Sequence, residues 1–382
     1  MGKLRKFPSG NRYKIVVKRV FAIIVLSLLI SCSEEQRVEH TQFVLNVEVD
    51  QAAPESKAVL TGKQFGSGET IGLFVYYGQE GVYPHTSLMP YSDRYKNVRA
   101  VRETVATREG NWRYKFNGSD GEFYNFYFMS PSLEALGQGL TIYAYAPYIK
   151  GTESIDNIPF TLGGNYNGLI DLMYAKQNSE SVNACLLPEG GKHEVTLTFR
   201  HSLALLNFRL KCMYAPTTMT VDAITLQKAS DGEGYSPLYV SGKYNALTNE
   251  FHELQQGQIR TNYRYSNTTN EFDSNNYKDY LFTIVPNLPL DPSLPFDPEN
   301  NPYMPYVDES YEVVFTLNGQ TLEYRYKIRA EDLLSDGGTG APVFEAGKTY
   351  TFNFIVDNYI QLDGVNVSDT WPDEVESIEI KF

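Results

Sequence analysis

The sequence F-V-L-N-V-E-V-D occupies residues 43–50 and decides the fold class. Apolar residues stand at every second position, and Val44 and three polar residues stand between them. The residues expected on the buried face are Phe43, Leu45, Val47 and Val49. A strict period of two over this length predicts a β-strand with one buried face. Pro54 and several small side chains end the pattern between residues 51 and 57.

Strand signals of the same kind recur along the rest of the chain. We expect residues 195–210 to form two strands or one long bent strand. Residues 91–111 are polar and carry five basic side chains, so we expect an exposed ribbon or a long loop there. Single helical turns are expected at residues 133–137 and 331–335. The remaining expected strands cover residues 70–77, 112–116, 123–129, 140–148, 171–175, 219–226, 238–240, 280–285, 311–317, 322–328, 348–356 and 377–382.

The composition favours the same fold class. The chain has 29 tyrosines and 21 phenylalanines in 382 residues, and aromatic side chains suit pleated, half-buried surfaces. Many short strands at near-regular spacing predict β-sandwiches. We therefore predict an all-β protein with two β-sandwich domains in tandem and few short helices. We place the two domains at residues 43–214 and 215–382, a division that suits the length of the chain.

A basic leader and a short apolar run precede the first strand. The run at residues 20–30 is too short to cross a bilayer, which takes ~20 residues, and fits the apolar core of a secretory signal. A serine directly before Cys32 is typical of a bacterial lipoprotein signal. We therefore expect residues 1–31 to be removed, Cys32 to carry the lipid and residues 32–42 to form a tether. A plain secretory leader with a chance cysteine is the alternative.

The charge of the chain argues against nucleic acid as a partner. The net charge is −13, and the leader holds seven basic residues and no acidic one, so the chain without it carries about −20. Two further cysteines, Cys185 and Cys212, are too few for a disulfide scaffold. They either pair with each other or stay buried as small apolar residues.

The sequence holds no arrangement that predicts catalysis, a metal site or a cofactor. Of the five histidines, His201 lies inside an apolar strand and is expected to be a buried, hydrogen-bonded core residue. His193 has no cysteine or acidic residue at the spacing of metal ligands. Acidic loops at residues 231–234 and 291–299 lack the ligand order of an EF-hand. We therefore expect a protein that is not an enzyme.

Five short motifs, in this order, resemble those of the fimbrillin family of Bacteroidales, the subunits of type V pili. The resemblance covers most of the chain that follows the leader. One departure is Glu69, where the family more often has aspartate. The motifs are F-G-S-G-E-T-I-G-L-F-V at residues 65–75, Y-A-Y-A-P-Y at 143–148, D-L-M-Y-A at 171–175, F-R-H-S-L-A at 199–204 and F-E-A-G-K-T-Y at 344–350.

The resemblance implies two transthyretin-like β-sandwiches and assembly by donor-strand exchange. A protease would cut behind a basic residue after the first strand, and Lys57 stands where that cut is expected. The cut would remove the strand that carries Phe43, Leu45, Val47 and Val49. A strand of the next subunit would then fill the open groove. The expected donor residues are Ile378, Ile380 and Phe382. Lys57 as an ordinary loop lysine, and residues 377–382 as an edge strand of their own domain, remain alternatives.

The expected function is therefore that of a structural or adhesive subunit of a pilus at the outer membrane and cell surface. The implied partners are other pilin subunits, in a homopolymer or heteropolymer, and outer-membrane lipid through Cys32. A host protein or glycan is a further candidate ligand. The alternative function is that of a surface glycan-binding lipoprotein, in which tyrosines, Trp112 and Trp371 would stack on sugars.

Overall fold

The computed structural model describes most of the strand-forming chain and shows an all-β protein. The described residues are 41–49, 65, 68–79, 87–88, 95–107, 110–115, 127–128, 138–163, 169–177, 182–183, 192–214, 218–229, 237–263, 270–286, 311–319, 321–333 and 343–368. Within these ranges, no helix is both long and apolar enough to span a membrane. The predictions for Cys32, Lys57, Cys185, Ile378, Ile380 and Phe382 concern residues outside the described ones.

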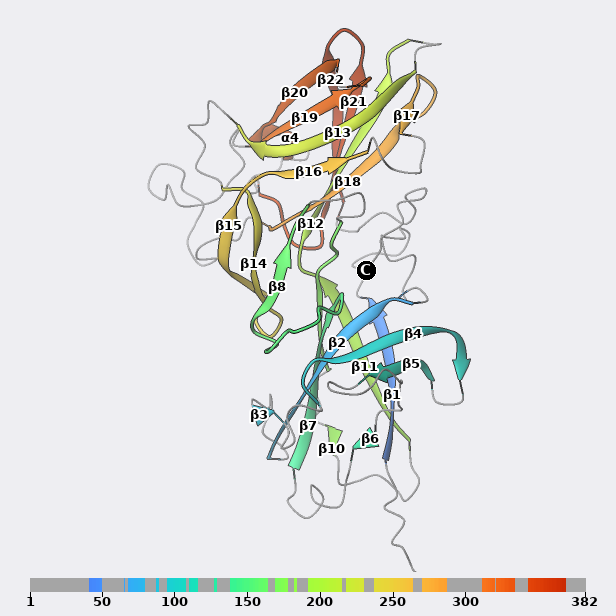
Figure 1. Cartoon of the computed structure of the whole chain (residues 1–382), viewed down its shortest axis with the longest axis vertical. Helices are drawn as coiled ribbons and strands as arrows, with labels where there is room; N and C mark the ends of the chain where they lie inside the picture. The colour runs from blue at the N-terminus through green and yellow to red at the C-terminus, as the bar shows by residue number, and fades with distance from the viewer. Residues whose placement is uncertain are drawn as a thin grey trace, which may run out of the picture.

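The first half of the chain forms a ten-stranded sheet (Figure 1). Its hydrogen-bonded order is β5-β4-β2-β7-β9-β11-β1-β6, with β10 beside β7 and β3 beside β2. The alternating segment at residues 43–49 is confirmed as strand. The strands are β1 (Thr41–Val49), β2 (Thr70–Gln79), β3 (Ser87–Leu88), β4 (Val98–Thr107), β5 (Gly110–Lys115), β6 (Tyr127–Phe128), β7 (Gln138–Ala146), β9 (Met173–Gln177), β10 (Val182–Asn183) and β11 (Lys192–His201).

The second half of the chain forms two facing sheets around an aromatic core. One sheet has the order β18-β12-β21-β22, and the other has the order β16-β13-β19-β20 with β17 beside β13. Phe208 of β12 lies at the centre of the core and is fully buried. The elements are β12 (Ala204–Cys212), β13 (Met219–Lys228), β16 (Ile259–Asn262), β17 (Glu271–Phe272), β18 (Lys278–Ile284), β19 (Tyr311–Leu317), β20 (Leu322–Ile328), α4 (Ala330–Leu333), β21 (Thr349–Val356) and β22 (Ile360–Ser368).

A smaller sheet links the two halves of the chain. Its order is β15-β14-β8, where β8 is Ile158–Thr161, β14 is Tyr239–Asn245 and β15 is Glu250–Gln256. β8 comes from the first half of the chain and pairs with β14 from the second. Buried Phe160 and Phe251 meet edge to face across this sheet, with ring centroids 5.4 Å apart. The two halves therefore share strand pairing as well as a covalent connection.

Strand pairing also crosses the domain boundary expected near residues 214–216. β12 precedes that position, yet it pairs with β18 and β21, which follow it. The partners change instead between β11 and β12, at residues 201–204, where the apolar stretch 195–210 turns from one sheet into the next. The segment is thus two strands. The division of the chain into two domains remains a prediction.

Within the polar segment at residues 91–111, the described residues 98–107 and 110–111 belong to strands, and they are not exposed throughout. β4 pairs with β2 and β5, so the ribbon continues the sheet. Val98 and Ala100 are fully buried because β2 covers one edge of β4 and the sheet core lies against these side chains. The expectation of an exposed ribbon is wrong for these two residues.

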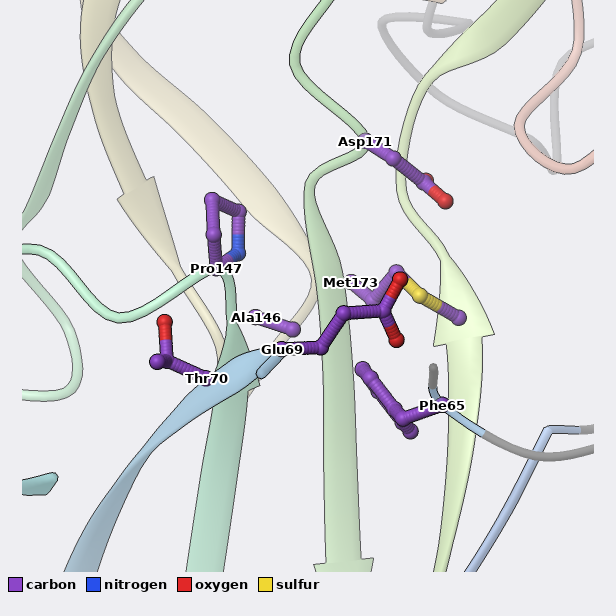
Figure 2. A pocket seen from close by; sticks show the side chains of 7 residues that line it. All are labelled: Phe65, Glu69, Thr70, Ala146, Pro147, Asp171 and Met173. Atoms are coloured by element: carbon purple, nitrogen blue, oxygen red, sulfur yellow. The ribbon is translucent and has the colours of Figure 1, made fainter. Parts of the chain in front are cut away.

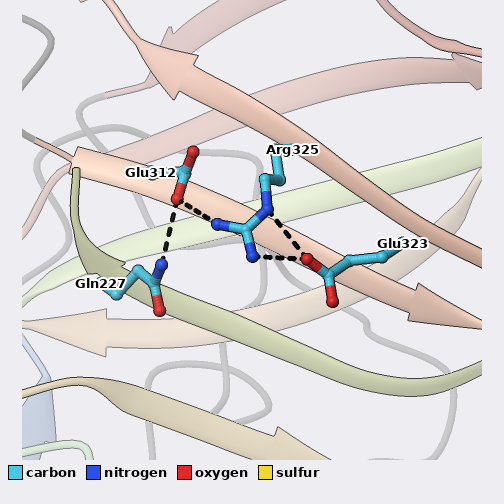
Figure 3. Close-up of polar contacts among 4 residues, drawn as sticks. All are labelled: Gln227, Glu312, Glu323 and Arg325. Atoms are coloured by element: carbon cyan, nitrogen blue, oxygen red, sulfur yellow. Dashed lines mark hydrogen bonds and ion pairs between the residues drawn. The ribbon is translucent and has the colours of Figure 1, made fainter. Parts of the chain in front are cut away.

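An ion pair with one buried partner, Glu312, connects strands of the five-stranded sheet (Figure 3). Glu312 of β19 has a side chain only 7% exposed and accepts a hydrogen bond from Nη1 of Arg325 at 2.9 Å. Nε2 of Gln227 donates to the same carboxylate at 3.0 Å, and Nε of Arg325 donates to Glu323 at 2.8 Å. Each partner therefore lies on a neighbouring strand, and together they satisfy a carboxylate that would otherwise be costly to bury.

Candidate functional site

The strand predicted to be removable lies at one side of the ten-stranded sheet. β1 pairs with β11 in parallel from Gln42 opposite Lys192 to Val49 opposite Phe199. Its other edge pairs with β6 at Thr41 and Gln42. Over the rest of β1, the described residues include no second hydrogen-bonded neighbour. β1 therefore closes the sheet along β11, and its loss would open eight register positions of β11.

The end of β1 and the next described residue of the chain both lie against Phe199 of β11. Val49 is the register partner of Phe199, and the next described residue, Phe65, packs on Phe199 edge to face at a centroid distance of 4.9 Å. Phe65 is 3% exposed. A side-chain nitrogen of Arg102 donates to the carbonyl of Phe65, and the backbone of Arg102 exchanges hydrogen bonds with Gly68 and Glu69 at 2.8 and 2.9 Å. Phe65 is thus held in place by contacts that do not involve β1.

A small pocket lies beside Phe65, where the ends of several strands meet (Figure 2). Its free volume of about 10 Å³ has room for about one water molecule. Three of the five sequence motifs supply its walls. The lining residues are Phe65, Glu69, Thr70, Ala146, Pro147, Asp171 and Met173.

The fourth motif reaches the pocket through His201. Nδ1 of His201 lies 2.8 Å from Oδ1 of Asp171, and the two side chains are 7% and 2% exposed. The other carboxylate oxygen, Oδ2, is buried and has no hydrogen-bond partner among the described residues. The prediction that His201 is a buried, hydrogen-bonded residue is confirmed. The pair joins the end of β11 to the segment before β9.

The fifth motif forms a turn that docks on the corner between β11 and β12. Gly347 has a φ of +76°, a conformation that favours glycine, and its N–H donates to the carbonyl of Leu203 at 2.9 Å. The hydroxyl of Tyr350 donates to the carbonyl of Val343 and accepts from the N–H of Glu345, both at 2.9 Å. The N–H of Leu205 donates to the carbonyl of Lys348 at 2.9 Å. The turn thus fixes the start of β12.

Tyr145 of the second motif is the hydrogen-bonding centre of the neighbouring loop. Its hydroxyl lies 2.7 Å from Oδ1 of Asn97 and accepts from the N–H of Ile149 at 3.1 Å. Burial raises the pKa of Tyr145 to about 12, although a hydrogen bond with Thr152 partly opposes the shift. The phenol is therefore neutral at physiological pH, and its hydrogen bonds hold the loop in place.

Replacing Gly72 with alanine should destabilise the protein by about 1–3 kcal/mol through overpacking. Gly72 is the register partner of Tyr145, and a Cβ on Gly72 would overlap the Tyr145 ring. Urea unfolding measures the loss. Gly364 is the matched control, because it is also a strand residue and a Cβ there meets nothing within 4 Å. Equal midpoints for Gly72→Ala and Gly364→Ala would contradict this account.

The five motifs therefore meet at one junction, where their contacts connect the ends of strands from distant segments. Glu69 and Asp171 line its pocket, but within the described ranges no three His, Cys, Asp or Glu residues are placed to hold a metal ion. Cys212 is buried and forms no disulfide with a described residue, and its thiol lies 3.6 Å from the carbonyl of Phe272. Sequence reasoning found the motifs but missed that they converge. The signal that links them is their position at strand ends, where a sheet places residues from distant segments together.

Comparison with a family profile described as fimbrillin-like finds a match over residues 57–371. Comparison with curated protein sequences finds no match. Among solved structures, a candidate cell-adhesion protein from Bacteroides ovatus aligns with a TM-score of 0.50 and 15% identity, covering 88% of this chain and 99% of that one. A second, from Bacteroides uniformis, aligns with a TM-score of 0.43 and 14% identity, covering 81% and 94%. The tip fimbrial protein Mfa3 from Porphyromonas gingivalis aligns with a TM-score of 0.38 and 9% identity, covering 84% and 98%.

Proposed function

Since this chain belongs to the fimbrillin-like family, we propose that it is a fimbrial subunit that joins its neighbours by exchanging a β-strand. The lipid on Cys32 delivers it to the outer membrane. Cleavage after Lys57 then releases β1, and a strand of the next subunit takes its place along β11. Uncleaved, the same chain stays tied to the membrane through Cys32 as the base of a fibre.

The observation that carries the proposal is the place of β1 in the sheet. β1 pairs with β11 at one side of the sheet, and the chain re-enters the described structure at Phe65, against the residue that faces Val49. Residues 50–64, which contain Lys57, therefore connect two points that meet at Phe199. A cut among them would separate β1 from the fold and leave Phe65 anchored by Arg102. The family match also begins at residue 57, after β1.

Physical chemistry gives an empty groove a strong tendency to accept a new strand. Removal of β1 leaves the backbone groups of β11 without their partners and opens an edge that can pair with another chain. An added strand restores these hydrogen bonds, and its alternate side chains fill the space. Each large apolar side chain that is buried contributes ~1.5–3 kcal/mol. Several such side chains make a long-lived joint.

The proposed donor is the end of the chain, where Ile378, Ile380 and Phe382 alternate with Glu379 and Lys381. This period of two matches that of the strand it would replace. Its three apolar residues are all large, so one face can fill the groove while the other stays polar.

Limited trypsin treatment of the purified protein tests the proposal. We expect N-terminal sequencing to find a chain that begins at Ala58. We expect this cut chain to form oligomers that appear as a ladder of bands on a detergent gel when the sample is not boiled. Lys57→Ala should block both results. Lys63→Ala is the matched control, because Lys63 lies in the same connecting segment, and it should leave both unchanged.

Two results would contradict the proposal. One is a chain cut after Lys57 that stays monomeric at high concentration and with prolonged incubation. The other is ladder formation by Lys57→Ala protein whose N-terminal segment is intact. Deleting residues 378–382 should yield cut monomers that accept a donor strand but cannot give one, so they should shorten the ladders of the unchanged protein.

A further inference from the structure

The ribbon formed by β4 and β5 is strongly basic in an otherwise acidic chain. Residues 94–115 hold seven basic and two acidic residues, whereas the whole chain has a net charge of −13. The junction accounts for Arg102, which is tied to Phe65. Lys96 pairs with Glu153. The remaining basic residues of the two strands have no assigned role.

The strand register gathers three of these basic residues on one face. Arg99 is the register partner of Lys115, and Val101 is the partner of Arg113. Because alternate residues of a strand share a face, Arg99, Arg113 and Lys115 belong to the same face of the ribbon. Like charges directly opposite each other across two strands are destabilising. This face therefore favours the approach of an anion.

Arg99 lacks an acidic partner within the described part of the chain. Its guanidinium lies over the ring of Tyr148, 5.7 Å from the centroid, and its Nε is buried with no hydrogen bond to another described residue. A cation held against an aromatic ring keeps its charge and its position. Arg99 is thus a fixed positive charge on the ribbon.

The ribbon stands next to the proposed groove. The hydrogen-bonded order begins at β5 and reaches β1 near its other end, yet β5 and β1 come within 8 Å of each other between Cα atoms. Figure 1 shows β5 beside β1. The sheet is therefore curved so that β11 forms one wall of the β1 position and the ribbon lies along the other.

We propose that the basic ribbon of β4 and β5 captures the acidic C-terminal segment of an incoming copy of this chain and guides its strand into the groove. Residues 369–382 contain five acidic residues and one lysine, and Asp373, Glu374 and Glu376 directly precede the proposed donor residues. This inference rests on the strand exchange proposed above. It adds a charged docking step that sets the rate of assembly.

Opposite charges at a docking site act mainly on the association rate. The first test is the assembly rate of the trypsin-cut protein, followed by light scattering, between about 20 mM and about 500 mM salt, where screening becomes strong. We expect the rate to fall at least about tenfold over this range. The resistance of the final oligomers to detergent should not change with salt, because apolar burial and backbone pairing hold the exchanged strand in the groove.

The second test reverses charges. Arg113→Glu combined with Lys115→Glu should slow assembly about tenfold at low salt. Lys228→Glu combined with Arg260→Glu changes the net charge equally on exposed residues of the five-stranded sheet, and it should leave the rate unchanged. Asp373→Lys, Glu374→Lys and Glu376→Lys together should slow assembly when the ribbon is unchanged and restore the assembly rate when the ribbon charges are reversed.

The outcomes separate this inference from the exchange itself. Ladders that form at the same rate in every variant and at every salt concentration would overturn the docking step and leave strand exchange standing. The absence of ladders from the unchanged cut protein would overturn both. Binding of heparin to the ribbon, with no effect of the ribbon on assembly, would assign the charge to an anionic polysaccharide and also overturn the inference. The salt series needs no variant, so a misfolded variant cannot obscure the result.

Discussion

Replacing Phe208 with alanine should lower the free energy of unfolding by about 3–5 kcal/mol. Phe208 is fully buried at the centre of the core between the two facing sheets. Four phenylalanine rings surround it, and their loss of contact adds a cavity cost to the lost burial. These rings belong to Phe282, Phe315, Phe352 and Phe354, with centroid distances of 5.5, 6.0, 5.6 and 6.4 Å.

Urea unfolding with a matched control measures this effect. Tyr359→Ala also removes an aromatic ring, but Tyr359 is 56% exposed, so its change should stay within about 0.5 kcal/mol. Phe208→Leu keeps most of the volume and should fall between the two. Similar losses for Phe208→Ala and Tyr359→Ala would mean that the rings around Phe208 do not form the main core of this half.

Replacing His201 with leucine should cost about 3–5 kcal/mol, as expected when one partner of a buried pair is removed. Asp171 is 2% exposed, and within the described structure Nδ1 of His201 is the hydrogen-bond partner of its carboxylate. Oδ2 already lacks a partner. Without His201, both carboxylate oxygens would be buried and unsatisfied.

A double-mutant cycle isolates the pair. His201→Leu combined with Asp171→Leu removes both polar groups, and replacing a whole buried pair with apolar residues is often close to neutral. We therefore expect the double variant to be more stable than His201→Leu alone. Additive losses in thermal unfolding would show that the two side chains contribute separately. His252→Leu is a suitable control. Nε2 of His252 lies 2.9 Å from the backbone carbonyl oxygen of Asp156, so its loss leaves no buried carboxylate without a partner.

Strands with dense apolar patterns could be predicted from the sequence, and polar strands could not. β19 and β20 have the expected bounds, and residues 195–210 form two strands. β15 escaped prediction because E-F-H-E-L-Q-Q has two apolar residues in seven and lies at the edge of its sheet. β8 and β22 were missed for a similar reason: β8 has four residues, and β22 carries mostly half-exposed side chains. Period and composition signal burial over a longer stretch, and each of these strands has at most two buried side chains.

The individual elements of the site could be predicted from the sequence, but the way they come together in the fold could not. The alternation of residues 43–49 predicts β1, and the position of His201 in an apolar strand predicts its burial. Neither indicates that β1 pairs in parallel with β11, more than 140 residues later, or that five motifs share one junction. Parallel pairing and register depend on contacts between distant segments, which no local pattern records.

The glycan-binding alternative receives no support from the described aromatic residues. The largest fully buried side chains include four tyrosines, among them Tyr145 and Tyr350, and they serve the core and the junction. The side chains of Trp112 and Trp371, which suggested stacking on sugars, lie outside the described part of the structure. Packing accounts for most of the aromatic side chains that the structure describes.

The passage from β11 to β12 determines how the molecule bears tension. The two strands follow each other along the length of the molecule, with a two-residue corner between them (Figure 1). A pull along that length passes from the lower sheet to the upper sheets through covalent backbone at this corner. The load then reaches the flanking strands by shear across many hydrogen bonds at once, so no single contact surface has to be peeled open. We therefore expect the molecule to resist stretching at the corner between β11 and β12.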